Sequence, residues 1–271
     1  MKRFLRRIVP ASARARVRDL VRPVDRATSD LLRAAGAPLD GALDCTLAAN
    51  AHGVYCVPRS SAHRPACQAI LRGGVWEPDT VALLGAERPS GDIVTAGAFF
   101  GDLLPALARS RRDGALVWAF EPNAENHRCA AVTVALNDPS TIRLQHAALG
   151  PAAGVADLVT TDAAGLPLGG GSHVVSSGDA AGHVESTPVA AIDDVVPTDR
   201  DVAAIHLDVE GFEEQALSGA LRTIERCRPL LVVENVPSPA WFDEHLAPLG
   251  YAVAGTVHVN TVYRAGATPR P

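Results

Sequence analysis

The stretch from residue 91 to residue 102 reads GDIVTAGAFFGD, and it decides the fold. Its IVTA portion is a short apolar run typical of a buried strand. Gly97 and Gly101 follow, and glycines there let the chain turn sharply and let a ligand touch backbone where no Cβ intervenes. The segment LLPALARSRR at 103–112 then has the proline near its start and the basic end that are typical of a helix. Together these residues predict a strand, a glycine turn and a helix.

Strands and helices keep alternating after this unit, which predicts an α/β fold with a parallel sheet covered by helices on both faces. Further strands are predicted at 115–121, 141–149, 203–209 and 229–235. Helices are predicted at 124–136, with Asn123 as the cap, at 212–227 and at 240–249. The segments 251–257 and 260–265 predict a closing hairpin.

Three regions divide the chain: a basic arm at 1–36, a small cap at 37–90 and the main domain at 91–271. In the cap, the sequence predicts two short strands around the turn Asn50–Gly53 and helices near 63–72 and 78–86. Within the main domain, residues 151–197 are rich in Gly, Ala, Ser and Asp. Their short strands, VADLVT and ESTPVAAI, are expected either to extend the sheet or to fold over the site. The run Gly169–Ser172 is either a flexible linker or a close approach to substrate.

Charge is unevenly distributed. Residues 1–33 carry ten basic side chains against three aspartates, a net +7, which leaves −12 for the rest of the chain. An acidic body argues against nucleic-acid binding, where a basic face is the usual footprint. The basic amphipathic arm either contacts an anionic membrane or a partner protein, or packs on the acidic body. Five cysteines form no zinc-type spacing, and with no export signal they indicate a reducing, cytoplasmic setting.

A carboxylate marks the next strand end. Glu121 closes the predicted second strand, twenty residues after Gly101. A carboxylate there can accept hydrogen bonds from both hydroxyls of a ribose lying over the glycine turn. The turn has the spacing G-x-x-x-G and lacks the dinucleotide fingerprint G-x-G-x-x-G, which weakens a nicotinamide interpretation. These residues favour a nucleoside site.

Five segments together resemble the FkbM family of methyltransferases. They are GDIVTAGAFFGD, VWAFEPNAENHRCA, LNDPSTIRLQHAALG, IHLDVEGFEEQALSGAL and RPLLVVEN, in that family's order and spacing between about residues 91 and 264. The pair F-E-P-N and D-V-E-G is the most distinctive part. The resemblance implies a Rossmann-like class I methyltransferase sheet of seven mostly parallel strands with an antiparallel closing hairpin, and S-adenosylmethionine as cofactor.

The resemblance also implies roles for individual residues. Gly97, Ala98 and Gly101 would line the methionine end of the cofactor, Glu121 would hold the ribose, and His146 to Ala148, including Ala147, would lie beside the adenine. Asn126 matches a position next to the cofactor only loosely.

Two positions depart from the family pattern. Thr95 stands where the family has an acidic residue that contacts the cofactor, so that contact is weakened or comes from Asp92 or Asp102. His206 stands where the family has lysine before D-V-E-G.

The end of the fourth strand supplies the candidates for catalysis. His206, Asp208 and Glu210 are expected at the edge of the sheet where ligands bind in open α/β folds. Period-two alternation is expected to put the His206 and Asp208 side chains on one face of the strand. A histidine that is neutral near pH 7 can accept a proton, so His206 is the first candidate base. The carboxylates could instead bind substrate hydroxyls, or bind a divalent ion with Glu234, and a metal requirement stays open.

The sequence therefore predicts transfer of a methyl group from S-adenosylmethionine to a hydroxyl of a small molecule, a sugar, glycolipid or secondary metabolite. N- or C-methylation stays open. Two alternatives remain: a nicotinamide-dependent oxidoreductase on a similar sheet, and an S-adenosylmethionine-binding protein without catalysis, which the departures at Thr95 and His206 would suit.

Overall fold

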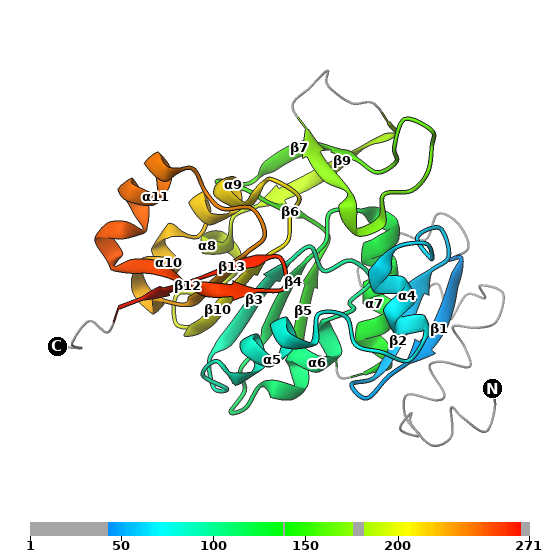
Figure 1. The fold of residues 1–271 in the computed structure, drawn as a ribbon, viewed down its shortest axis with the longest axis horizontal. Coiled ribbons are helices and arrows are strands. Elements are labelled where there is room, and N and C mark those ends of the chain that lie inside the picture. Colours follow the sequence, from blue (N-terminus) through cyan, green and yellow to red (C-terminus); the bar gives the residue numbers. More distant parts are fainter. Residues whose placement is uncertain (1–42, 138, 176–181, 267–271) are drawn as a thin grey trace.

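A computed structural model describes residues 43–137, 139–175 and 182–266. Its centre is a seven-stranded sheet in which all neighbours are parallel except those of the closing hairpin (Figure 1). The predicted sheet is thus confirmed. Across the sheet the strands are β12 (Tyr251–Val257), β13 (Asn260–Ala265), β11 (Leu230–Val233), β10 (Val202–Leu207), β3 (Asp92–Ala96), β4 (Val117–Phe120) and β5 (Ile142–Gln145).

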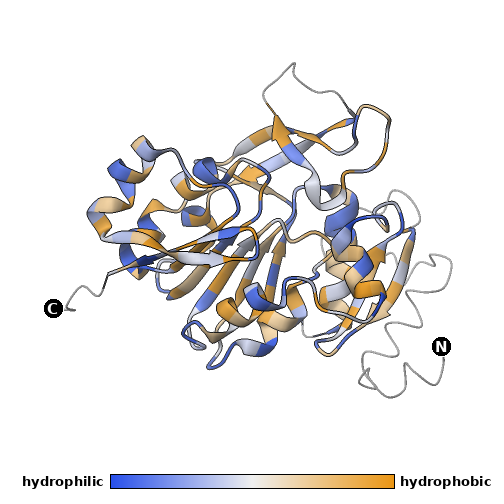
Figure 2. Cartoon of the chain, in the orientation of Figure 1, coloured by the Kyte–Doolittle hydropathy of each residue, from blue (hydrophilic) through white to orange (hydrophobic). Residues whose placement is uncertain are grey.

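Helices cover both faces of this sheet (Figure 1). Successive side chains of a strand point to opposite faces, so Val94 packs in one core and Ile93 in the other. Figure 2 shows hydrophobic residues concentrated along the strands and the helix sides that meet them. One layer holds α5 (Pro78–Ala86), α6 (Leu104–Ser110) and α7 (Ala124–Leu136); the other holds α8 (Ile192–Val195), α9 (Glu213–Ser218), α10 (Leu221–Cys227) and α11 (Pro239–His245).

The cap predictions are confirmed for the residues described. An antiparallel hairpin of β1 (Cys45–Ala49) and β2 (Val54–Pro58) packs with α4 (Pro65–Leu71) against α7. Helix α5 leaves this group and packs on α6, so the cap is continuous with the main domain. The predicted basic arm lies outside the described residues. In the part of the chain that is described, no helix has the length and apolar character of a membrane span.

Two predicted elements are split. The strand expected at 141–149 breaks after Gln145, and β6 (Ala148–Leu149) joins a second sheet of order β6-β9-β7-β8. Its other strands are β7 (Gly154–Val159), β8 (His173–Val175) and β9 (Val184–Ala190). The segment 151–197 therefore builds a separate sheet and does not extend the main one.

The helix expected at 212–227 divides into α9 and α10 at Gly219. A Cβ on Gly219 would lie 2.0 Å from the Gly150 carbonyl oxygen, so the two backbones pack too closely for any side chain. The Asp193 carboxylate then accepts hydrogen bonds from the backbone N–H groups of Arg222 and Thr223, which caps the start of α10.

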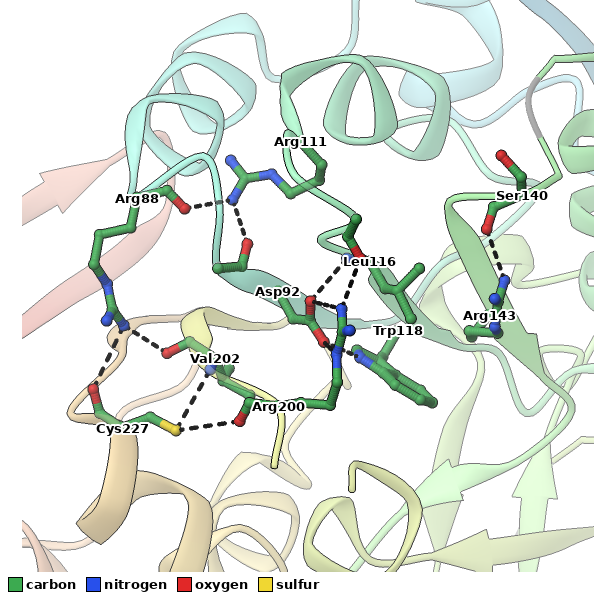
Figure 3. Close-up of polar contacts among 12 residues, drawn as sticks. Arg88, Asp92, Arg111, Leu116, Trp118, Ser140, Arg143, Arg200, Val202 and Cys227 are labelled. Atoms are coloured by element: carbon green, nitrogen blue, oxygen red, sulfur yellow. Dashed lines mark hydrogen bonds and ion pairs between the residues drawn. The ribbon is translucent and has the colours of Figure 1, made fainter. Parts of the chain in front are cut away.

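A polar network ties the amino ends of the strands together (Figure 3). Asp92 is 1% exposed and accepts hydrogen bonds from the Arg200 guanidinium, the Trp118 indole N–H and the Leu116 backbone N–H. Nearby, the Arg111 guanidinium donates to several backbone carbonyls, including that of Gly91 at 2.8 Å. The Asp92 side chain thus makes its hydrogen bonds at the end of the sheet opposite the glycine turn. The expectation that it replaces the missing family contact to the cofactor is wrong.

Candidate functional site

The first of two cavities lies at the carboxyl ends of the parallel strands. It encloses about 430 Å³, part of it open to solvent. Gly97 follows β3, Glu121 follows β4 and Asp208 follows β10, and all three line it. Apolar walls complete the cavity, formed by Phe120, Pro122, Ala147, Leu149, Leu158, Val174 and Phe212. The cavity therefore combines apolar walls with the carboxyl groups of Glu121 and Asp208, a combination that suits a nucleoside with a polar tail.

The glycine turn is held in a conformation that demands glycine. Gly97 and Gly101 have φ of +81° and +83°, where glycine carries no steric cost. A Cβ on Gly97 would lie 1.9 Å from the Asp208 carbonyl oxygen, so the turn after β3 presses directly on the end of β10. Gly101 instead packs on Thr133 of α7 and does not line the cavity. Gly97 thus forms part of the cavity floor, and Gly101 allows the turn to pack closely on α7.

Glu121 is fixed by the turn that it faces. Its side chain is buried, with one oxygen accepting from the Phe99 backbone N–H at 2.7 Å and the other from the Asn123 backbone N–H at 2.9 Å. Phe99 can donate because it adopts a left-handed φ of 47°. Burial raises the pKa of the Glu121 carboxyl to about 8 despite these hydrogen bonds. The carboxylate keeps unused lone pairs, and hydroxyl donors from a ribose would favour its charged form.

Three carboxyl groups gather just after β10 and β11, and one of them, Asp208, lines the cavity. Oxygens of Asp208, Glu210 and Glu234 all lie within 4.8 Å of one another. Burial first, and then the neighbouring Glu234 carboxyl, raises the pKa of Asp208 to about 9. Glu210 adopts a left-handed φ of 54°, a strained conformation that is found at functional sites. This group can hold a proton between carboxyls, and it is also the set of described residues best placed to hold a cation.

His206 lies below the cavity floor. It is 2% exposed and is not among the lining residues. Its Nδ1 is 3.0 Å from the Thr95 hydroxyl, and its Nε2 has no hydrogen-bond partner among the described residues. Burial lowers the pKa of His206 to about 4. The two positions that depart from the family pattern are therefore partners in adjacent strands, facing the α5–α6 layer.

The remaining predicted cofactor residues divide into lining and supporting groups. Ala147 lines the cavity, whereas Ala98 packs in the core beneath the turn. The Asn126 amide lies 3.4 Å from a Glu121 oxygen and supports it from behind. His146 points away, with its Nε2 2.9 Å from the Pro122 carbonyl oxygen, and it stacks on His127. Thus Gly97, Glu121 and Ala147 reach the cavity, and the others hold its walls.

The second sheet supplies lining residues that the motifs did not indicate. Leu158 and Val174 come from β7 and β8, and Gly170 and Ser172 come from the turn before β8. A Cβ on Gly169 would lie 3.1 Å from the Phe99 ring, so the glycine run approaches the site closely. Of the two interpretations of this run, the structure supports the close approach. The only sequence signal for it was the glycine run, because the strands around it carry no motif.

Similarity to known proteins agrees with this geometry. The family model described as the methyltransferase FkbM domain matches residues 95–252, more than half of the chain. Among curated proteins, no match to the chain is found.

Solved structures with a similar fold include a methyltransferase FkbM from Methylobacillus flagellatus KT, at 20% identity and a TM-score of 0.39, which covers 65% of this chain and 44% of that one. A methyltransferase from Geobacter sulfurreducens is 15% identical with a TM-score of 0.42, covering 96% and 98% of the two chains. The tRNA (uracil-54, C5)-methyltransferase of Pyrococcus abyssi, solved with S-adenosyl-L-homocysteine, is 14% identical with a TM-score of 0.42 and covers 82% and 44%. This chain thus spans less than half the length of the M. flagellatus protein.

The match covers the glycine turn, Glu121 and the carboxyl group at the end of β10 in one continuous model. The chain belongs to the FkbM family of methyltransferases.

Proposed function

We propose that this protein transfers a methyl group from S-adenosylmethionine to a hydroxyl group of a small polyhydroxylated molecule, such as a sugar, glycolipid or secondary metabolite. The observation that carries the proposal is the buried Glu121 carboxylate. It lines the same cavity as Asp208 and the apolar walls, in a member of a methyltransferase family.

The cavity residues fit this cofactor. Glu121 would accept hydrogen bonds from the ribose hydroxyls, and the apolar wall around Ala147 and Leu158 would pack on the adenine. Gly97 leaves backbone exposed beside Asp208, where the methionine portion would pass. When bound, S-adenosylmethionine supplies an activated methyl group on a positively charged sulfur.

Asp208 is our choice for the group that receives the acceptor's proton. A base must lie within hydrogen-bond reach of that proton, and Asp208 lines the cavity whereas His206 does not. The raised pKa of Asp208 gives the carboxyl group affinity for a proton near neutral pH, and a positive charge in the cavity would favour its ionised form. The lowered pKa of His206 makes its ring a poor base. We assign His206 to positioning, through Thr95.

Glu210 and Glu234 would orient the acceptor. Both carboxyls stand beside Asp208 and can accept hydrogen bonds from neighbouring hydroxyls. An acceptor with several hydroxyls would satisfy the group better than one with a single hydroxyl. Alignment of the acceptor oxygen with the methyl group and exclusion of water are then the main catalytic contributions.

The proposal is tested by incubating the protein with isotopically labelled S-adenosylmethionine and fractionated small-molecule extracts from the source cells. Mass spectrometry should find the label on the oxygen of a polyhydroxylated compound. Label on nitrogen or carbon would contradict the O-methylation. Cofactor binding with no labelled product in any fraction would favour a binding protein without catalysis.

A further inference from the structure

A second cavity lies beside the first, across the turn formed by Gly169–Gly171. Gly169 lines the second cavity and Gly170 lines the first, so the turn forms part of the wall between them. The second cavity encloses about 450 Å³. Its walls come from the cap, the start of α7 and the second sheet: Ser61, Asn123, Glu125, Asn126, Thr160, Thr161, Pro167, Gly169, His183 and Glu185.

Two of these side chains are almost fully buried and retain a free polar atom. Ser61 and Asn126 are each 1% exposed. The Ser61 hydroxyl makes no hydrogen bond with any residue of the described ranges. The Asn126 amide nitrogen donates to the Gly169 carbonyl at 3.0 Å, while its carbonyl oxygen accepts nothing from the described part of the chain. Neither atom is fully enclosed by the described residues, so both are available to a ligand or ordered water in the cavity.

The rest of the lining is rich in acceptors. Glu125 uses one oxygen to accept from the Ser60 hydroxyl at 2.7 Å, and its other oxygen has no hydrogen-bond partner among the described residues. Glu185 is partly exposed and lies 4.0 Å from His183. The Thr160 hydroxyl donates to the His183 carbonyl oxygen and can still accept. Such a surface matches a ligand with several hydroxyl donors and repels anions.

We propose that this second cavity binds a saccharide ring. The ring hydroxyls would donate to the Glu125 and Glu185 carboxylates and to the Asn126 carbonyl oxygen. The Ser61 hydroxyl would make a further hydrogen bond to the ring. Pro167 is the one apolar side chain in the lining, which disfavours a flat apolar ligand. This site lies apart from the reacting group and needs no cofactor, although Asn123 and Asn126 in its lining also hydrogen-bond to Glu121.

The test uses saturation-transfer NMR on the full-length protein with the uncharged methyl glycosides of glucose, mannose, galactose and rhamnose, and with glucuronate as an anionic comparison. At least one neutral glycoside should bind, more tightly than glucuronate, and its signal should persist in saturating S-adenosylhomocysteine. Ser61→Ala should weaken that glycoside roughly two- to tenfold, the effect of one neutral hydrogen bond. Glu185→Gln should weaken it roughly tenfold or more.

Ser186→Ala is the matched control, because Ser186 is exposed on the same strand as Glu185 and does not line the cavity. The Ser186→Ala variant should bind the glycoside with the same affinity as the wild type. The proposal is overturned if no neutral glycoside binds, if S-adenosylhomocysteine displaces the glycoside, or if Ser61→Ala and Glu185→Gln both bind like the wild type. Failure of S-adenosylhomocysteine to bind at all would contradict the proposed cofactor and leave the glycoside result to stand on its own.

Discussion

The two ends of the central sheet differ in whether a buried carboxyl group has a cationic partner. At the amino end, Asp92 is paired with Arg200 and satisfied by two further donors. At the carboxyl end, none of Asp102, Glu121 and Asp208 pairs with an Arg or Lys of the described residues. Burial raises the pKa of these three groups to about 7, 8 and 9. Uncompensated carboxyls are costly unless something else stabilises them, so the contrast separates the end that holds the fold from the end that binds ligands.

The largest effect is expected on turnover at the carboxyl end. Asp208→Asn keeps the side-chain shape but removes the proton acceptor, and methyl transfer should fall about 10²–10⁴-fold. Affinity for S-adenosylhomocysteine should change little. His206→Asn is the comparison: if the ring only positions Thr95, turnover should fall far less. Rate measurements on both variants with one acceptor decide this, and a larger loss for His206→Asn would return the role of base to the histidine.

At the amino end, the loss should appear in stability. Asp92→Ala strips Arg200 of its partner and leaves the Trp118 indole N–H and the Leu116 N–H without an acceptor. We expect a loss of about 3–5 kcal/mol in the free energy of unfolding. Urea unfolding measures it. Glu121→Ala also leaves two backbone N–H groups without an acceptor, but it strips no arginine of its partner, so its loss should be smaller. Equal losses in the two variants would remove the distinction between the ends.

The sequence predicted the sheet well because its signals are local. The strand–glycine–helix unit at 91–112, the Asn123 cap and the closing hairpin each depend on neighbouring residues, and all appear in the structure. The second sheet was not predictable in form. It pairs β6 with β9 from just over forty residues away, and short strands of that kind carry no signal for their partner.

The candidate site was predictable only where a motif reaches the cavity. Gly97, Glu121 and Asp208 occupy it as their places at strand ends indicate. Alternation placed His206 and Asp208 on one face, but β10 ends at Leu207, so the pattern no longer applies at Asp208. Thr95 and His206 looked like independent departures from a family pattern. Only the register of β3 against β10 reveals that they lie side by side and form one pair.

The unpaired carboxyls also predict how stability depends on pH. Their folded-state pKa values are raised, so the folded protein holds protons that the unfolded chain releases. The resulting stability is complete below about pH 4, the ordinary carboxyl pKa, and is lost as pH rises through about 7 to 9. Without cofactor, the free energy of unfolding should therefore fall by a few kcal/mol (~2 or more) between about pH 5 and 9. Urea unfolding across this range should show a shallower slope for Glu121→Gln, and a stability that rises with pH would contradict the assignment.

The Glu121 carboxylate at the end of β4 is proposed to bind the ribose of the cofactor. Calorimetric titration of S-adenosylhomocysteine into the wild type and into Glu121→Ala measures that contribution. Loss of hydrogen bonds to a charged group should cost about 1.5–3 kcal/mol, roughly a ten- to hundredfold weaker affinity. NAD should not bind either protein. Asp92→Asn serves as the control from the opposite end, and its affinity should match that of the wild type. Equal affinity of the wild type and Glu121→Ala would contradict the account.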